Sequence, residues 1–154
     1  MNRLLKKSNR PLMASVALSA LLAAACSTAS MSQGIKISLS GSQEVPAVNT
    51  AASGSGTIMV AADKSVSGSV TTSGIDGKMA HIHEGAKGKN GPPIIPLSKT
   101  GDGVWSVPAG AKLSDVQYAS YMAGNLYVNV HSAANPGGEI RGQIMPPTER
   151  VGGY

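Results

Sequence analysis

The sequence has no phenylalanine, and aromatic residues make up only 3% of its 154 residues. Aromatic rings therefore cannot dominate a hydrophobic core, which must be built from valine, isoleucine, leucine, alanine and methionine. Glycine is abundant at 19 residues, and nine prolines accompany it. Short strands joined by many turns fit this composition better than long helices do.

A block of like charge is also missing from most of the chain, although the formal net charge is +5. Four of the 13 basic residues lie within residues 1–10, and the remaining nine nearly balance the eight acidic residues. A nucleic-acid-binding surface requires a concentrated basic patch. We therefore exclude nucleic acid as a partner.

Cysteine occurs once, at Cys26, which excludes an internal disulfide. Residues 1–10 carry four basic side chains, and residues 11–25 (PLMASVALSALLAAA) are uncharged and mostly apolar. This order is typical of a secretory signal, and the apolar run is shorter than the roughly 20 residues of a membrane span. Cys26 follows Leu22-Ala23-Ala24-Ala25, which resembles the lipobox of bacterial lipoproteins. We expect lipidation at Cys26; cleavage in the alanine run, which leaves a free thiol, is the alternative.

The lipobox resemblance implies an exported lipoprotein whose only membrane attachment is its N-terminal lipid. Ser27 after the cysteine implies sorting to the outer membrane, where the protein would face the periplasm or the cell surface. The predicted organisation is a lipoprotein signal peptide over residues 1–25, a flexible tether over 26–34, one folded domain over 35–145 and a C-terminal tail over 146–154.

Short strand-like runs recur from Ile35 onward between glycine-rich turns. They cover residues 35–40, 56–62, 65–72, 78–84, 93–97, 103–108, 125–131 and 138–144. Residues 113–123 break this pattern, because Ser114 and Gln117 form a capping-box pair and Gly124 supplies a stop, which predicts a short helix. We predict an all-β fold: an antiparallel Greek-key sandwich or barrel, immunoglobulin-like or superoxide-dismutase-like, with one short helix.

All three histidines lie in two of these runs, with His81 and His83 in one and His131 at the end of another. Alternation along a strand places His81 and His83 on the face opposite Ala80 and Ile82, with their Cα atoms about 6.6 Å apart. Two imidazoles at that spacing can bind one metal ion, and His131 completes the site if the two strands are neighbours. Imidazole ligands suit copper, with zinc as the alternative, better than calcium or magnesium.

Each of these polar residues also has a structural interpretation. Histidine pairs of this kind occur on exposed strands without a metal, and His131 lies beside a predicted turn at residues 135–138 whose backbone it can bond. Met79 shares the face of the histidine pair, where a thioether is a soft ligand for Cu(I), but methionine on a strand more often packs. Glu139 and Arg141 lie two apart on the last strand, where a structural role, as a pair or with cross-strand partners, is expected.

The glycine-rich segment 85–93 (GAKGKNGPP) lacks the helix and the Gly-Lys-Ser/Thr ending that a phosphate-binding loop requires. We expect a flexible loop that covers the histidine strand. No serine stands in a nucleophile elbow, and the scattered carboxylates offer no acid/base pair. The residue pattern therefore favours a binding protein over an enzyme.

Several segments together resemble the CHRD domain family, named for its copies in chordin: residues 80–97, 125–131 and 135–144, with residues 37–48 at the usual beginning. The resemblance covers nearly all of the chain after the signal peptide, and it implies no particular activity. The stretch His81-Ile82-His83-Glu84 is also similar to the copper-ligand strand of copper/zinc superoxide dismutases. The fourth copper histidine, the zinc ligands and the disulfide cysteines of those enzymes are missing here.

The leading hypothesis is a lipid-anchored CHRD domain of the cell envelope that binds a copper-type ion through His81, His83 and His131. Storage, delivery or sequestration of the ion is the expected role. One alternative is a non-enzymatic interaction module with an envelope protein as its partner. A second alternative is superoxide-dismutase-like redox activity at the same histidines.

Overall fold

Nine strands pair in one antiparallel sheet in the computed structural model, which describes residues 34–147. The strands are β1 (Ile35–Ser40), β2 (Ser53–Val60), β3 (Val66–Ser73), β4 (Gly77–Glu84), β5 (Pro93–Pro96), β6 (Ser98–Gly101), β7 (Val104–Ser106), β8 (Leu126–Ser132) and β9 (Ile140–Ile144). A 3-10 helix, η1 (Gly41–Gln43), follows β1, and α1 (Asp115–Met122) precedes β8. The order in the sheet is β5-β4-β8-β9-β1-β2-β3-β7-β6, so the first and last strands of the chain are neighbours.

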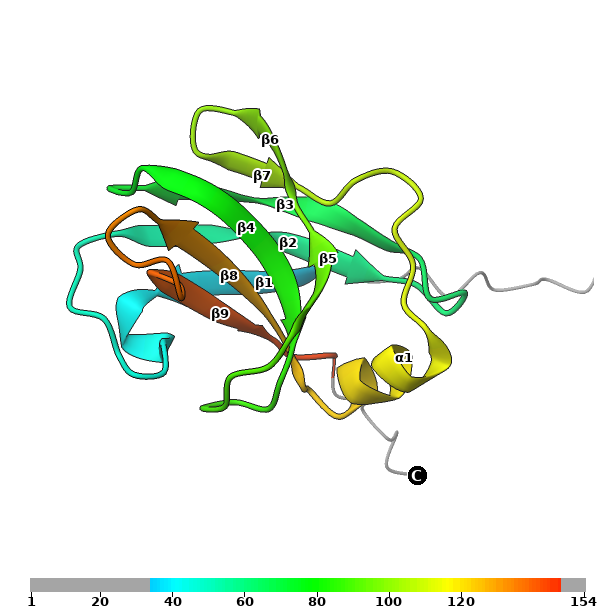
Figure 1. The fold of residues 1–154 in the computed structure, drawn as a ribbon. Helices are drawn as coiled ribbons and strands as arrows, with labels where there is room; N and C mark the ends of the chain where they lie inside the picture. Colours follow the sequence, from blue (N-terminus) through cyan, green and yellow to red (C-terminus); the bar gives the residue numbers. More distant parts are fainter. Residues whose placement is uncertain (1–33, 148–154) are drawn as a thin grey trace, which may run out of the picture. The chain divides into compact units, whose positions relative to one another are not determined.

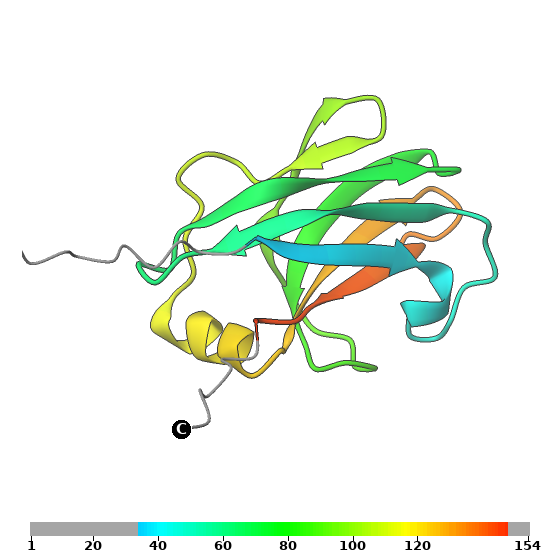
Figure 2. The same ribbon diagram turned by 180° about the vertical axis from the view of Figure 1, so that it is seen from behind.

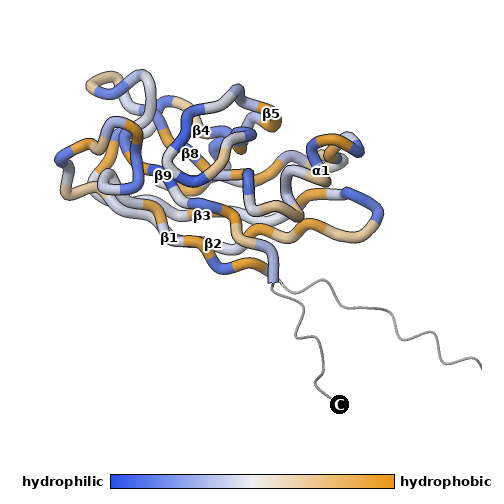
Figure 3. The backbone as a smooth tube through the Cα atoms, turned by 90° about the horizontal axis from the view of Figure 1, so that it is seen from below, coloured by the Kyte–Doolittle hydropathy of each residue, from blue (hydrophilic) through white to orange (hydrophobic). Residues whose placement is uncertain are grey.

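The sheet curls into two layers that enclose the hydrophobic core. Strands β4, β8 and β9 lie across β1, β2 and β3, as Figure 1 and the reverse view in Figure 2 show. The view from below in Figure 3 separates the same two layers and places α1 at one end. The aliphatic side chains of both layers meet between them, and Ile58, Val70, Val128 and Ile140 are fully buried there. The all-β prediction is confirmed, as a nearly closed, barrel-like antiparallel sheet with one short helix.

The predicted helix is present with the expected start and stop. The Ser114 side chain accepts a hydrogen bond from the Gln117 backbone at 3.2 Å, and the Gln117 side chain accepts one from the Ser114 backbone at 2.9 Å. Gly124 follows with a φ of 74°, a left-handed conformation that glycine adopts without strain. This short helix bridges β7 and β8 at the end of the sheet.

The sequence pattern missed two elements, η1 and β6. Strand β6 is exposed along its whole length and contains no apolar residue, so no alternation marks it. Its pairing with β7 defines it instead. The sequence pattern also starts the second strand three residues late, at residue 56, whereas β2 begins at Ser53, where it pairs with Ser40 of β1.

Strand β8 is buried on both of its faces. Leu126, Val128 and Val130 enter the hydrophobic core, as the alternation predicted. Tyr127, Asn129 and His131 point the opposite way and are also buried, at 1%, 1% and 6% exposure. The protein therefore has a second buried layer, which is polar, on the outer side of the sheet.

The predicted signal peptide, Cys26 and the tether lie outside the described residues, except for Gly34, and so do residues 148–154 of the predicted tail. Within residues 34–147, no helix has the length and hydropathy needed to cross a membrane.

Candidate metal centre

The three histidines meet on the outer face of β4 and β8, the face opposite the hydrophobic core. Strands β4 and β8 are direct neighbours, and their register pairs His83 with Tyr127 and His81 with Asn129. One ring nitrogen from each histidine lies within 4.8 Å of the other two. The structure thus brings together the three residues that the sequence singled out, and Ala80 and Ile82 face the core between them.

Backbone carbonyls orient two of the three rings. Nδ1 of His83 lies 2.9 Å from the carbonyl oxygen of Gly91, and Nδ1 of His131 lies 2.9 Å from that of Pro136. A carbonyl oxygen only accepts, so each Nδ1 donates its proton, and in the tautomer that this bond selects the lone pair is on Nε2. Metal-binding histidines in proteins are held in this way by a hydrogen bond from the other ring nitrogen.

The remaining nitrogens lie close together. Nε2 of His131 accepts a hydrogen bond from Nδ1 of His81 at 3.2 Å, and an ion that bound both nitrogens would replace this shared proton. Nε2 of His83 is buried and has no hydrogen-bond partner. A buried polar atom without a partner costs about 1–3 kcal/mol. A bound cation would give that lone pair a partner.

The spacing of the rings fits one ion. Ring centroids are separated by 5.5 Å between His81 and His83, 5.1 Å between His81 and His131, and 5.7 Å between His83 and His131. A tetrahedral ion with metal–nitrogen bonds of about 2.0–2.1 Å holds its nitrogens about 3.3 Å apart. One pair of ring nitrogens, in His81 and His131, is already at 3.2 Å, and all three nitrogens lie within 4.8 Å of one another. The donor set of three imidazoles suits copper or zinc.

Burial disfavours the protonated form of His81 and His83. Burial lowers the pKa of His83 most, and the nearby His131, His81 and Arg141 lower it further, against an opposing effect of the Gly91 hydrogen bond. Burial also lowers the pKa of His81, with a smaller contribution from His131. A lowered histidine pKa favours the unprotonated ring, which is the form that binds a metal.

A stack of side chains supports His83 from beneath. The Tyr127 ring lies against the His83 ring, with centroids 5.0 Å apart and planes 16° apart. The Arg141 guanidinium also lies over the Tyr127 ring, with its central carbon 4.0 Å from the ring centroid. The Tyr127 hydroxyl accepts a hydrogen bond from the Gly91 backbone at 3.1 Å, so the stack is tied to the same residue that orients His83.

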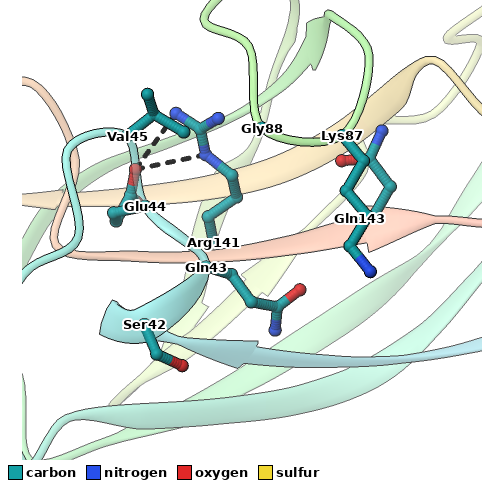
Figure 4. A pocket seen from close by; sticks show the side chains of 8 residues that line it. All are labelled: Ser42, Gln43, Glu44, Val45, Lys87, Gly88, Arg141 and Gln143. Atoms are coloured by element: carbon teal, nitrogen blue, oxygen red, sulfur yellow. Dashed lines mark hydrogen bonds and ion pairs between the residues drawn. The ribbon is translucent and has the colours of Figure 1, made fainter.

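Arg141 anchors this stack through a buried ion pair with Glu44, at the end of η1. Both side chains are 3% exposed, and the Arg141 Nε donates to Glu44 Oε2 at 3.1 Å (Figure 4). Arg141 also donates to the Lys89 carbonyl and the Asn90 side chain, which fixes the 85–92 loop. Burial raises the pKa of Glu44, and the Arg141 charge opposes that rise. The expected loop over the histidine strand is therefore present and is held in place by Arg141.

Glu139 has other partners than Arg141. Its carboxylate accepts hydrogen bonds from Thr50, at 2.8 Å, and from Ser132. These bonds lower the pKa of Glu139. Glu139 and Arg141 therefore do not pair with each other, and their partners Thr50 and Glu44 belong to the segment between η1 and β2 instead of to a facing strand.

A pocket of about 210 Å³ adjoins the ion pair, and none of the three histidines lines it. Its lining comes from the segment around η1, the 85–92 loop and β9 (Figure 4). Sequence reasoning gave Glu44, Tyr127 and Asn129 no part in the histidine site. Alternation along β8 does place Tyr127 and Asn129 on the same face as His131, whereas nothing near Glu44 in the sequence signals its partner.

The family model of the CHRD domain matches residues 35–144. The chain therefore belongs to the CHRD domain family, as the four sequence segments indicated. No curated protein and no solved structure is detectably similar to the chain.

Proposed function

We propose that this CHRD domain binds one copper-type ion through Nδ1 of His81, Nε2 of His83 and Nε2 of His131, with zinc as the alternative ion. The observation that carries this proposal is the pair of backbone carbonyls that direct two buried lone pairs into the cluster. The Nε2 of His83 is buried and has no hydrogen-bond partner. A histidine that served only to bond the backbone of a turn would not be expected to bury an unpaired nitrogen. The family is consistent with an envelope or extracellular domain.

Storage, delivery or sequestration of the ion is the role we propose in the cell envelope, with Cys26 as the lipid anchor. His83 and His131 are buried, but His81 is only partly buried. An ion in this cluster would be held from below and open to solvent at His81. That geometry supports a site that loads and releases an ion from one side.

The test is to add Cu(II) to the purified, metal-free protein and to measure binding by titration calorimetry and stability by thermal unfolding. We expect one equivalent to bind and to raise the unfolding temperature, because a ligand that binds only the folded state stabilises it. The H83A and H131A variants should each lose this binding. K87A, in the neighbouring loop, is the control because Lys87 is exposed and is not among the ligands.

Unchanged copper binding in the double variant H83A/H131A would remove the proposal. An absence of any metal-induced thermal shift in the wild-type protein would also remove it. The envelope interaction module would then be the better candidate, with cross-linking in intact cells as the way to find its partner.

A further inference from the structure

Met79 is an exposed methionine at the open edge of the histidine cluster. It lies two residues before His81 on β4, and therefore on the same face of the strand, and it faces His131 directly across the β4–β8 pair. Directly opposite residues in an antiparallel pair have Cβ atoms about 4.5–5.5 Å apart. The Met79 side chain thus starts beside two of the three proposed ligands.

Packing does not account for this methionine. Its side chain is 50% exposed, and the neighbours that the register gives it on this face are histidines and Asn129 instead of aliphatic residues. The apolar residues of β4 that serve the core are Ala80 and Ile82, on the other face. An exposed methionine gains little by burial here, so the common structural role of the residue is not fulfilled.

The surroundings also determine where a fourth ligand can enter. Tyr127 stacks on His83 at one end of the cluster, and the Gly91 and Pro136 carbonyls occupy the outer nitrogens of His83 and His131. The partly buried His81 and the exposed Met79 mark the side that remains open. Thioether sulfur is a soft, neutral donor that selects Cu(I) over harder divalent ions.

We propose that the Met79 Sδ is the fourth ligand of the site when it holds Cu(I). This inference rests on the proposed function and extends it, because it assigns the ion as copper and the cuprous state as the one that the site prefers. Three imidazoles alone do not distinguish copper from zinc. A thioether at the fourth position does, since zinc sites use thiolate, imidazole and carboxylate ligands.

The test uses the purified protein loaded anaerobically with Cu(I), and X-ray absorption at the copper edge. We expect a sulfur scatterer in the first coordination shell of the wild-type protein and its loss in M79L, which keeps the volume of the side chain. M122L is the matched control, because Met122 on α1 is similarly exposed, at 52%, and lies outside the cluster. It should retain the sulfur scatterer.

Affinity measurements give an independent result. Competition with a chromogenic Cu(I) chelator should show at least a tenfold weaker Cu(I) affinity in M79L, while the Cu(II) affinity stays within a few-fold of wild type. A tenfold change in that ratio corresponds to a fall of about 59 mV in the reduction potential of bound copper. M122L should change neither affinity.

The outcomes separate this inference from the function on which it rests. A first shell of nitrogen and oxygen only, or equal Cu(I) affinity in M79L and wild type, would overturn the role of Met79 and leave the three-histidine site standing. No Cu(I) or Cu(II) binding in any form of the protein would overturn both.

Discussion

Replacement of Glu44 by alanine should strongly destabilise the protein, because it leaves the Arg141 guanidinium buried without its counter-charge. Both side chains are 3% exposed, so solvent screens their interaction very little. Removing one partner of such a buried pair typically costs about 3–5 kcal/mol. Small domains have a total stability of about 5–15 kcal/mol. E44A should therefore lose a large share of the free energy of unfolding.

Urea denaturation at pH 7 measures this loss, and a double variant tests its cause. Replacement of both partners by apolar residues, as in E44L/R141M, removes the buried charge together with its counter-ion, and such exchanges are often nearly neutral. The double variant should thus be more stable than E44A. The exposed pair of Lys78 and Asp76 is the control, since its side chains are 53% and 77% exposed; D76A should hardly move the urea midpoint. A loss of less than about 1 kcal/mol in E44A, or a double variant no more stable than E44A, would refute the reasoning.

Three further predictions concern the histidine cluster and the loop that supports it. The metal-free protein should lose stability as the pH falls below about 6.5, because the folded state lowers the pKa of His81 and His83 while the unfolded chain binds protons at the usual pKa. The urea midpoint should therefore fall between pH 8 and pH 5. An equal fall of the midpoint in H81A/H83A would contradict this. Gly91→Ala should weaken copper binding and lower the unfolding temperature, because a Cβ there would lie 1.6 Å from the Glu84 carbonyl oxygen and displace the carbonyl that orients His83. Gly137→Ala, whose Cβ meets nothing within 4 Å, should leave both quantities near wild type. Tyr127→Phe should cost about 0.5–1.5 kcal/mol in urea denaturation, since the partly buried Gly91 N–H loses its acceptor; a wild-type midpoint would show that this hydrogen bond contributes nothing.

The strands that carry the histidines could be predicted because their residues alternate in character. Leu126, Val128 and Val130 mark the core face of β8, and this pattern alone puts His131 on the other face. The Ser114 and Gln117 pair likewise marked the start of α1 from local chemistry. Both patterns lie within a few consecutive residues, so each can be recognised from the local sequence alone.

The long-range contacts that surround the histidines could not be predicted from local patterns. Glu44 and Arg141 are 97 residues apart in the sequence, and no periodicity links a residue after η1 to a residue on β9. The register that sets Met79 opposite His131 arises from the pairing of β4 with β8, which follows from the whole sheet order. The sequence pattern placed the histidines on the outer face and predicted a loop over their strand, but the near-complete burial of Tyr127, Asn129 and His131 on that face came only with the tertiary structure. Lipidation at Cys26, the outer-membrane location and dismutase-like activity stay predictions.

The interior position of β8 in the sheet should slow the exchange of its amide hydrogens. Strand β8 is hydrogen-bonded to β4 on one side and to β9 on the other, and all seven of its residues are buried. Its amide hydrogens should exchange with deuterated water only through global unfolding, as in the most protected segments of other domains. His131 is therefore carried by the part of the backbone that opens last, and an arriving ion would meet a receptor already shaped for it.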